Sequence, residues 1–407
     1  MTRLSLLLLL LAGLPTSRAA AEPEDSRLGR LIRWWLDETD VHTRQKFLES
    51  IERVSKGKAS VVAAAIRAGR HRDYRKRPVL AVTGKLPEFD EDRIEARPLG
   101  DAAGRVATLL LPRGYDPQRA WPLVLDLGSR LPTSPETVRV MLRPVVLEQK
   151  SVNIIESVVL SLLVQIFETV HIDPSRVFLQ ADGKKAKLAA YIALHNPDRF
   201  AGLLCGQHAW KDGGDLARNA STFDVLAIGA ERSPRPLQSF VKKLTRYRKS
   251  HRFLARPEDD RTLWPVIEEW YATTKRDPAP KEIQLLLDRP GRVRSFWLGA
   301  APHVPSRKKS KIDRWTQTTM TSKAWIKATR GPGNLVIVES NERISGFTIF
   351  VDEAVFDPDK PIKVRINGHE PPESAVAFLY VEDLLEDYRD RRDADLLSAC
   401  QCKFSIR

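Results

Sequence analysis

Residues 170–206, "VHIDPSRVFLQADGKKAKLAAYIALHNPDRFAGLLCG", carry the clearest structural signal in the chain. The apolar run RVFLQ predicts a buried strand, the polar residues after it predict a sharp turn, and KAKLAAYIALHN predicts a helix. A second apolar strand, FAGLLCG, follows. Strands without polar alternation are typical of a parallel sheet covered on both faces. Gly183 lies at the centre of the turn, where such a sheet presents its functional groups.

The same alternation of strands and helices continues on both sides of this stretch. Residues 121–129 (WPLVLDLGS) and 223–230 (FDVLAIGA) predict further buried strands, and residues 153–170 predict an apolar helix. Helices alternating with strands indicate an α/β fold with a mainly parallel sheet. Cys205, inside one of the strands, is expected to be a small core residue.

Composition and pattern divide the chain into four parts. Residues 1–21 combine a basic start, an apolar run and small residues, which predicts a secretory signal peptide removed near Ala21. Residues 22–75 predict a helical segment, residues 76–276 the α/β domain, and residues 277–407 a β-rich module with a late helix. We therefore expect an exported protein (periplasmic, cell-envelope or extracellular) without a transmembrane segment in the mature chain.

The chain is basic, with a formal net charge of +14. Removal of residues 1–21 leaves 64 basic and 52 acidic residues, a charge of +12. Such a balance suits a polyanion. However, basic and acidic residues are mixed, and the densest basic groups, residues 242–252 and 306–311, lack the interleaved aromatics of a nucleic-acid platform. Nucleic acid is therefore not the expected partner.

Cysteine spacing gives no sign of a metal or other cofactor. The chain has three cysteines, of which Cys400 and Cys402 form a C-x-C pair near the C-terminus. This number does not make a disulfide framework, and no Cys/His spacing matches a zinc site. We predict a protein without a cofactor that is stabilised by burial of apolar residues.

Residues 95–275 resemble the secreted α/β-hydrolases of the esterase, polyhydroxybutyrate-depolymerase and prolyl-oligopeptidase type. One part of the resemblance is "LLLPRGYDPQRAWPLVLDLGS" at residues 109–129; the other is the stretch from residue 172 to 202. There the family shows Asp-Pro-x-Arg-Val, then Gly-His-Ser-Met-Gly-Gly, then Pro-Asp-x-Phe-Ala. The agreeing residues are Asp173, Pro174, Arg176, Pro197, Asp198 and Phe200. The C-terminal module resembles β-rich tails of some bacterial members.

The resemblance places Gly183 where these hydrolases carry their serine nucleophile. Glycine has no side chain that could attack a carbonyl group, and no Gly-x-Ser-x-Gly motif occurs anywhere in the chain. Ala181 and Lys185 take the two positions where the sharp turn needs small residues, so Lys185 is expected to crowd the helix against the strand. Asp182 is an alternative nucleophile, which would require the turn to slip by one residue.

Other positions of the family's site are altered as well. The resemblance puts Gly128 and Ser129 in the oxyanion loop, Glu231 beside the expected acid position, and His251 at the base position. Basic neighbours of His251 are expected to depress its proton affinity. Only about twenty residues separate Ser129 from Ser151. Many relatives have a further strand and covering loops there, so we expect a trimmed rim.

Three hypotheses follow from these observations. The first is an exported pseudo-hydrolase that binds an unidentified ligand or protein partner in the former cleft or on the β module. The second is an active ester or peptide hydrolase with a non-standard site. The third is a polyanion-binding envelope protein, in which the net charge matters more than the cleft.

Overall fold

The computed structural model describes residues 24–69, 93–99, 107–112, 114–129, 131, 133, 136–142, 147, 151–206, 216–229, 235–248, 250–256, 260–288, 293–302, 323–369 and 373–406. The predicted signal peptide, Glu231 and the basic group at 306–311 lie outside the described residues.

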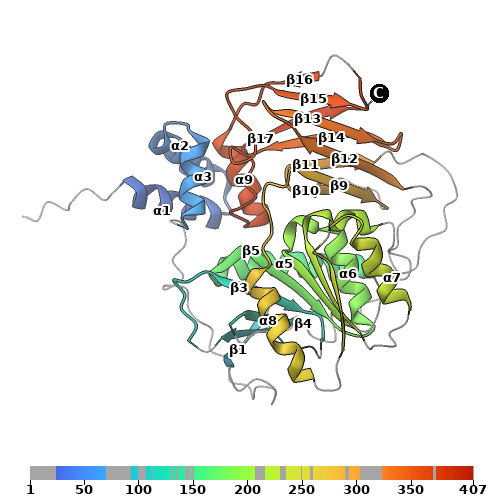
Figure 1. Cartoon of the computed structure of the whole chain (residues 1–407). Coiled ribbons are helices and arrows are strands. Elements are labelled where there is room, and N and C mark those ends of the chain that lie inside the picture. Colours follow the sequence, from blue (N-terminus) through green and yellow to red (C-terminus); the bar gives the residue numbers. More distant parts are fainter. Residues whose placement is uncertain are drawn as a thin grey trace, which may run out of the picture.

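An eight-stranded sheet forms the centre of the chain (Figure 1). In spatial order its strands are β1 (Arg93–Leu99), β2 (Ala107–Pro112), β4 (Val138–Leu142), β3 (Trp121–Asp126), β5 (Ile172–Ala181), β6 (Gly202–Gly206), β7 (Asp224–Gly229) and β8 (Arg252–Ala255). Strand β2 is antiparallel to β1 and β4, and the strands from β4 to β8 run parallel. The predicted α/β-hydrolase-like fold class is confirmed, with β3 and β5 in the middle of the sheet.

Helices cover both faces of this sheet, which explains why its strands β3, β6 and β7 are buried at every position. The helices are α5 (Val152–Thr169), α6 (Lys185–His195), α7 (Arg235–Leu244) and α8 (Trp264–Thr273), with short 3-10 turns η1 (Pro197–Arg199), η2 (Leu216–Thr222) and η3 (Asp260–Leu263). Helices α5, α6 and α7 share one hydrophobic core with the sheet. On the other face α8 packs Trp270 and Tyr271 against Phe178 of β5.

Strand β4 corrects one expectation. The interval between Ser129 and Ser151 was expected to lack the further strand of related hydrolases, yet Val138–Leu142 pairs with β3 on one side and β2 on the other. The strand is five residues long, and its exposure alternates because only one side of it faces the core. Such a short, half-buried strand gives a weaker pattern than β3 or β5.

Helix α5 has the length and composition of a membrane-spanning helix, and it is the one helix in the described ranges that does. Its buried residues include Val159, Leu163 and Ile166, which pack in the core of the sheet. Because α5 meets the length and composition criteria of a membrane-spanning helix, the expected absence of a transmembrane segment in the mature chain stays a prediction.

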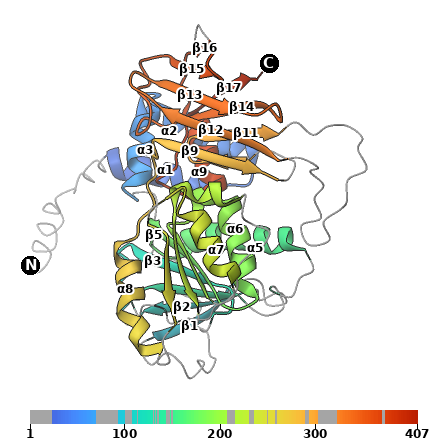
Figure 2. The same ribbon diagram turned by 45° about the vertical axis from the view of Figure 1, so that its right-hand side comes forward.

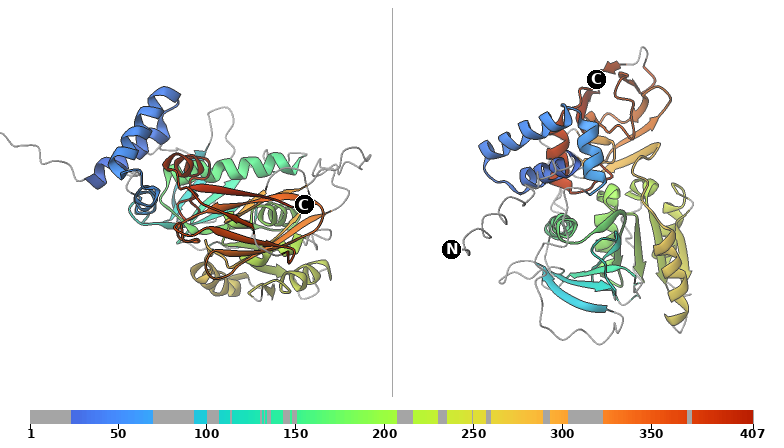
Figure 3. Two further views of the ribbon diagram at one scale, coloured as in Figure 1. Left: turned by 90° about the horizontal axis from the view of Figure 1, so that it is seen from above. Right: turned by 90° about the vertical axis from the view of Figure 1, so that its left-hand side faces the viewer.

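The N-terminal segment forms three helices, α1 (Glu24–Asp37), α2 (Val41–Ser55) and α3 (Ala59–Arg67). They pack against α9 (Val381–Arg391) of the C-terminal module, as the views in Figures 1 and 3 agree. Ile32, Ile51 and Val62 of these helices share a fully buried cluster with Leu385 of α9. The first and last parts of the chain are therefore joined by one small core.

The C-terminal module is a pair of β-sheets that pack face to face (Figure 2). One has the order β10 (Val293–Ser295), β11 (Leu298–Pro302), β14 (Ile344–Val351) and β17 (Cys400–Ser405). The other has the order β16 (Glu373–Ala375), β15 (Ile362–Ile366), β13 (Leu335–Ser340), β12 (Ala324–Arg330) and β9 (Glu282–Leu287). Their inward side chains make a second hydrophobic core, as the predicted β-rich module requires.

The module docks on the amino-terminal edge of the parallel sheet. Asn219 of η2, just before β7, both donates to the Leu286 carbonyl (3.1 Å) and accepts from the Leu286 amide (2.6 Å). The Arg276 guanidinium, fully buried, binds both carboxylate oxygens of Asp393 at 2.6 and 2.9 Å. The carboxyl-terminal edge, where the turn around Gly183 lies, is therefore the edge away from the module.

Candidate functional site

The turn between β5 and α6 has the strand-to-helix form expected of a nucleophile elbow, with a glycine at its centre. Strand β5 ends at Ala181, α6 begins at Lys185, and Gly183 between them has φ +56°. This left-handed conformation is costly for a residue with a Cβ. A Cβ added at Gly183 would meet no atom within 4 Å. The position thus has room for a side chain but holds no atom that could attack a substrate.

Asp182 stabilises this turn. Its Oδ1 atom accepts a hydrogen bond from the Gly183 amide at 2.7 Å, and its Oδ2 atom lies 3.5 Å from the Arg256 guanidinium. The side chain passes over Gly206 so closely that a Cβ there would lie 2.3 Å from Oδ1. The turn has not slipped, because Ala181 remains paired with Cys205 in the sheet. Asp182 is consequently a turn acceptor and not the residue at the elbow centre.

Lys185 does not crowd the elbow as expected. Its Nζ atom donates a hydrogen bond to the Leu147 carbonyl at 2.7 Å. The next residue of the helix, Ala186, is buried in the core in the normal way. The long side chain therefore projects along the surface of the turn, and α6 still packs on the sheet.

A buried polar network lies directly beneath the elbow, and sequence reasoning missed it. Gln180, fully buried, donates to the Leu131 carbonyl (2.9 Å) and accepts from the hydroxyls of Tyr271 (2.6 Å) and Thr133 (3.2 Å). A polar residue at the end of an otherwise apolar strand was the one available signal. Because buried polar groups are costly unless paired, this network fixes the loop after β3 to the end of β5.

The loop after β3 has its backbone donors occupied. Asp126 Oδ1 accepts hydrogen bonds from the amides of Gly128 (2.8 Å) and Ser129 (2.6 Å). Its Oδ2 atom accepts from the Arg139 guanidinium, with Nε at 2.9 Å. Gly128 has φ +86°, and this left-handed turn brings the Ser129 amide back toward the carboxylate. An oxyanion hole needs amides that point at the substrate. The Gly128 and Ser129 amides instead donate to the chain's own carboxylate.

His251 is not part of this site, which corrects the prediction that it is the base. It immediately precedes β8, which lies three strands away from β5 in the sheet. The pairing across β6 and β7 places Ala181 level with Phe253. Gly183 is two residues beyond this level and His251 two residues before it, so they are four residues apart along the strand direction. At about 3.3 Å per residue and 4.8 Å per strand, the two lie roughly 20 Å apart. His251 thus lies at the module-facing edge, on the opposite side of the sheet from the elbow.

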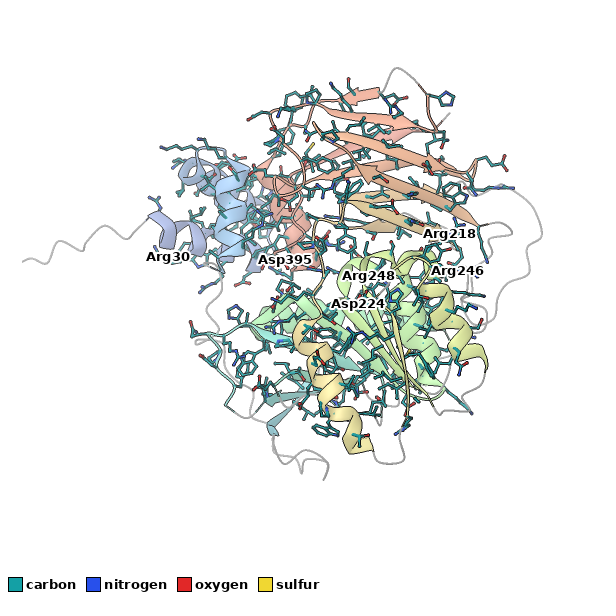
Figure 4. The ribbon with its side chains drawn as sticks, in the orientation of Figure 1. Arg30, Arg218, Asp224, Arg246, Arg248 and Asp395 are labelled. Atoms are coloured by element: carbon teal, nitrogen blue, oxygen red, sulfur yellow. The ribbon has the colours of Figure 1, made fainter. Side chains whose placement is uncertain are left out.

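The surroundings of His251 explain its chemistry. The ring is buried, and its Nδ1 atom accepts a hydrogen bond from the Val225 amide at 3.0 Å. Burial first, and then the nearby Arg248 charge, lower the pKa of His251 to about 4. Arg248 pairs with Asp224 at 2.7 Å, and both are labelled near the top of the sheet in Figure 4. The direction agrees with the expected depression of proton affinity, but burial rather than basic neighbours is the main cause, and the histidine has a structural role.

Glu231, proposed beside the acid position, lies outside the described residues, so its place relative to Gly183 is not defined. Among the residues that the structure describes, no group of three or more His, Cys, Asp or Glu side chains could hold a metal ion. The site at the carboxyl edge is therefore built from Gly183, Asp182 and the Asp126 loop.

Comparisons with known proteins give likeness in fold alone. No family model matches the chain, and no curated protein matches it. A thermostable esterase structure is 15% identical, with a TM-score of 0.36, over 46% of this chain and 64% of that one. The isopeptidase AtxE2 is 16% identical over 46% of this chain and 41% of that one, with a TM-score of 0.37.

A ferulic acid esterase from Anaeromyces mucronatus is 15% identical over 47% of this chain and 93% of its own length, with a TM-score of 0.34. The chain spans less than two thirds of the length of the first two structures. At this similarity nothing about substrate or activity follows for this chain.

Proposed function

We propose that this protein is an exported, catalytically inactive hydrolase-fold protein that binds its ligand without cleaving it. The observation that carries the proposal is Gly183, which has the left-handed backbone of an elbow and no side chain. Acyl transfer needs an attacking atom; electrostatic stabilisation alone leaves only water to attack.

Two further features support inactivity. The Asp126 carboxylate holds the two amides that the family resemblance assigns to the oxyanion loop. The histidine assigned to the base lies at the opposite edge of the sheet with a pKa of about 4. Restoring one group of a site built from several gives little rate, because the groups act as a unit. The alteration therefore extends beyond a single missing serine.

The carboxyl edge of the sheet is the proposed ligand site. Ligands of open α/β sheets bind outside the carboxyl ends of the strands. The β module docks at the other edge through Asn219, Arg276 and Asp393, so it does not cover the elbow. The ligand is proposed to rest on the turn at Gly183, a residue that itself has no side chain.

The test combines turnover with binding. A panel of p-nitrophenyl and feruloyl esters is incubated with the purified protein, and the thermal midpoint is measured with each ester and its product acid. The proposal predicts no release above the buffer rate, and an upward shift of the midpoint by at least one compound, since a bound ligand stabilises the folded state. Turnover that saturates with ester concentration would refute it.

Export is tested separately. The mature protein is purified from fractionated cells, and its N-terminal residue is determined by mass spectrometry. The proposal predicts a chain that begins near Glu22 in the exported fraction. Intact residues 1–21 in the cytoplasmic fraction would contradict export and leave the binding proposal untouched.

A further inference from the structure

The C-x-C pair of the β module lies on one face of an edge strand. Strand β17 is the last strand of its sheet, and Cys400 and Cys402 pair with Val351 and Ile349 of β14. Because side chains alternate along a strand, both thiols point to the same side. Both cysteines are free. Their Cα atoms are about 6.6 Å apart at two strand rises, inside the range of a disulfide, but their parallel side chains leave the Cβ atoms farther apart than the roughly 3.5–4.5 Å of a disulfide. Forming the bond therefore requires this edge strand to bend.

Cys400 and Cys402 are buried, with 9% and 5% of their surface exposed, and both residues line a cavity at the surface of the module. The cavity has a volume of about 550 Å³, and its other walls include Phe378, Tyr380 and Asp383. Phe378 and Tyr380 are more than half exposed, although they are large apolar side chains. The Tyr380 amide donates to the Ala399 carbonyl at 2.9 Å, which holds this wall beside the start of β17. A cavity of this size accommodates a small molecule.

The two thiols differ in acidity because they interact with each other. A hydrogen bond from the Cys402 thiol, together with the backbone amides of Phe378 and Gln401, lowers the pKa of Cys400 to about 7. The same hydrogen bond raises the pKa of Cys402. Near neutral pH the pair therefore holds at most one thiolate, on Cys400, and the two thiols titrate as a unit.

Cys205 shows the contrast within the same chain. It is fully enclosed in the core of the parallel sheet, and burial raises its pKa to about 12. A thiol enclosed in an apolar core, with its pKa raised in this way, is inert. Cys400 differs from Cys205 in the hydrogen-bond donors that lower its pKa and in the cavity beside it.

We propose that Cys400 and Cys402 form a thiol–disulfide exchange site for a low-molecular-weight disulfide that enters this cavity. The Cys400 thiolate attacks one sulfur of the substrate disulfide, forms a mixed disulfide and releases the other half as a thiolate. Cys402 then loses its proton to solvent and attacks the Cys400 sulfur. The Cys400–Cys402 disulfide forms, the second substrate thiolate leaves, and two electrons have passed from the pair to the substrate. This site is independent of the proposed function at Gly183.

The experiment follows the reaction of the purified, reduced protein with oxidised glutathione by intact mass spectrometry at neutral pH. The wild type is expected to lose two hydrogens without accumulating an adduct. Cys402→Ser should accumulate one glutathionyl group on Cys400, since no thiol resolves it. Cys400→Ser should react at least roughly tenfold more slowly, because the thiolate fraction sets the rate. Cys205→Ser is the matched control and should behave as the wild type.

A second measurement distinguishes a thiol with a lowered pKa from one that reacts only because it is accessible. The pH dependence of alkylation by iodoacetamide should have a midpoint near 7 for Cys400 in the wild type. In Cys402→Ala it should move upward, because the hydrogen-bond donor is gone. A stable adduct on the wild type, or equal reactivity of the folded Cys400→Ser and Cys402→Ser variants, would overturn the assignment.

Discussion

The amide nitrogen of Ser129 lies 2.6 Å from Oδ1 of Asp126, which also accepts from the Gly128 amide at 2.8 Å. This relationship turns a loop that could have bound a substrate oxyanion into a self-contained turn. A carboxylate there would also repel a developing negative charge. The loop therefore supports the proposed inactivity independently of Gly183.

Asp126→Asn should cost about 3–5 kcal/mol of unfolding free energy, because it removes the buried carboxylate that pairs with the Arg139 guanidinium. Asp116→Asn is the control. Asp116 also accepts an amide hydrogen bond two residues on, from Gln118 at 2.8 Å, but it is exposed. The control should cost less than about 1 kcal/mol in urea unfolding. Equal losses in both variants would show that burial of Asp126 is not what matters.

Gly183→Ser should fold and remain inactive. The new Cβ meets no neighbour, so the cost is about 1–2 kcal/mol for a left-handed residue. Gly114→Ser is a matched control, with φ +75° and the same open surroundings far from the elbow. The two variants should lose similar unfolding free energy, and neither should hydrolyse p-nitrophenyl esters. Activity in Gly183→Ser alone would mean that the remaining groups still form a working site.

His251 should make the protein less stable in mild acid. Its pKa is about 4 in the folded chain, against about 6.5 when unfolded. Between these values the unfolded chain binds a proton that the folded chain does not, so stability falls as the pH decreases from about 6.5 to about 4. The loss approaches about 3 kcal/mol at the acid end.

In His251→Asn the amide oxygen can still accept from the Val225 amide, but the titrating group is gone. Urea unfolding at pH 4.5 and 7 should therefore differ less for this variant than for the wild type. His42→Asn, at an exposed histidine, should leave the wild-type difference intact. An unchanged difference in His251→Asn would assign the acid sensitivity to other groups.

Arg276→Ala should loosen the β module. Burial alone would raise the pKa of Asp393, but the Arg276 guanidinium outweighs it and the pKa is lowered. Without Arg276 the Asp393 carboxylate is buried and loses its main partner, at a cost of about 3–5 kcal/mol. Limited proteolysis should then cut within residues 276–282, and Lys275→Ala, at the exposed neighbour, should stay resistant. Resistance in both variants would refute this anchoring role.

The elements with continuous apolar sequence could be predicted from the sequence. Every residue of β3, the second half of β5 and most of α6 are buried, so these stretches have continuous apolar sequence. Strand β4 could not be found in this way, because five alternating residues carry little pattern. The place of Gly183 in a strand-to-helix turn was also predictable, since the turn is local in sequence.

The chemistry of the site depends on contacts between residues that are distant in the sequence, and these contacts could not be predicted from sequence patterns. The sequence places Asp126 at the end of a strand. Its hydrogen bonds with two amides and with Arg139 could not be predicted, because they depend on the left-handed backbone of Gly128. His251 was assigned to the wrong edge, because its sequence position does not say at which end of β8 it lies. Asp198, a residue of the family resemblance, binds Arg391 at 2.5 Å, 193 residues away.

The most direct test of inactivity is labelling of the wild-type protein with a serine-reactive fluorophosphonate, followed by peptide mass spectrometry. A fluorophosphonate reports a nucleophile activated by its surroundings, whatever its place in the sequence. The account predicts no labelling above that of the heat-denatured protein, for the wild type and for Gly183→Ser alike. Stoichiometric labelling of one serine in the folded wild type would contradict the account and identify an active hydrolase.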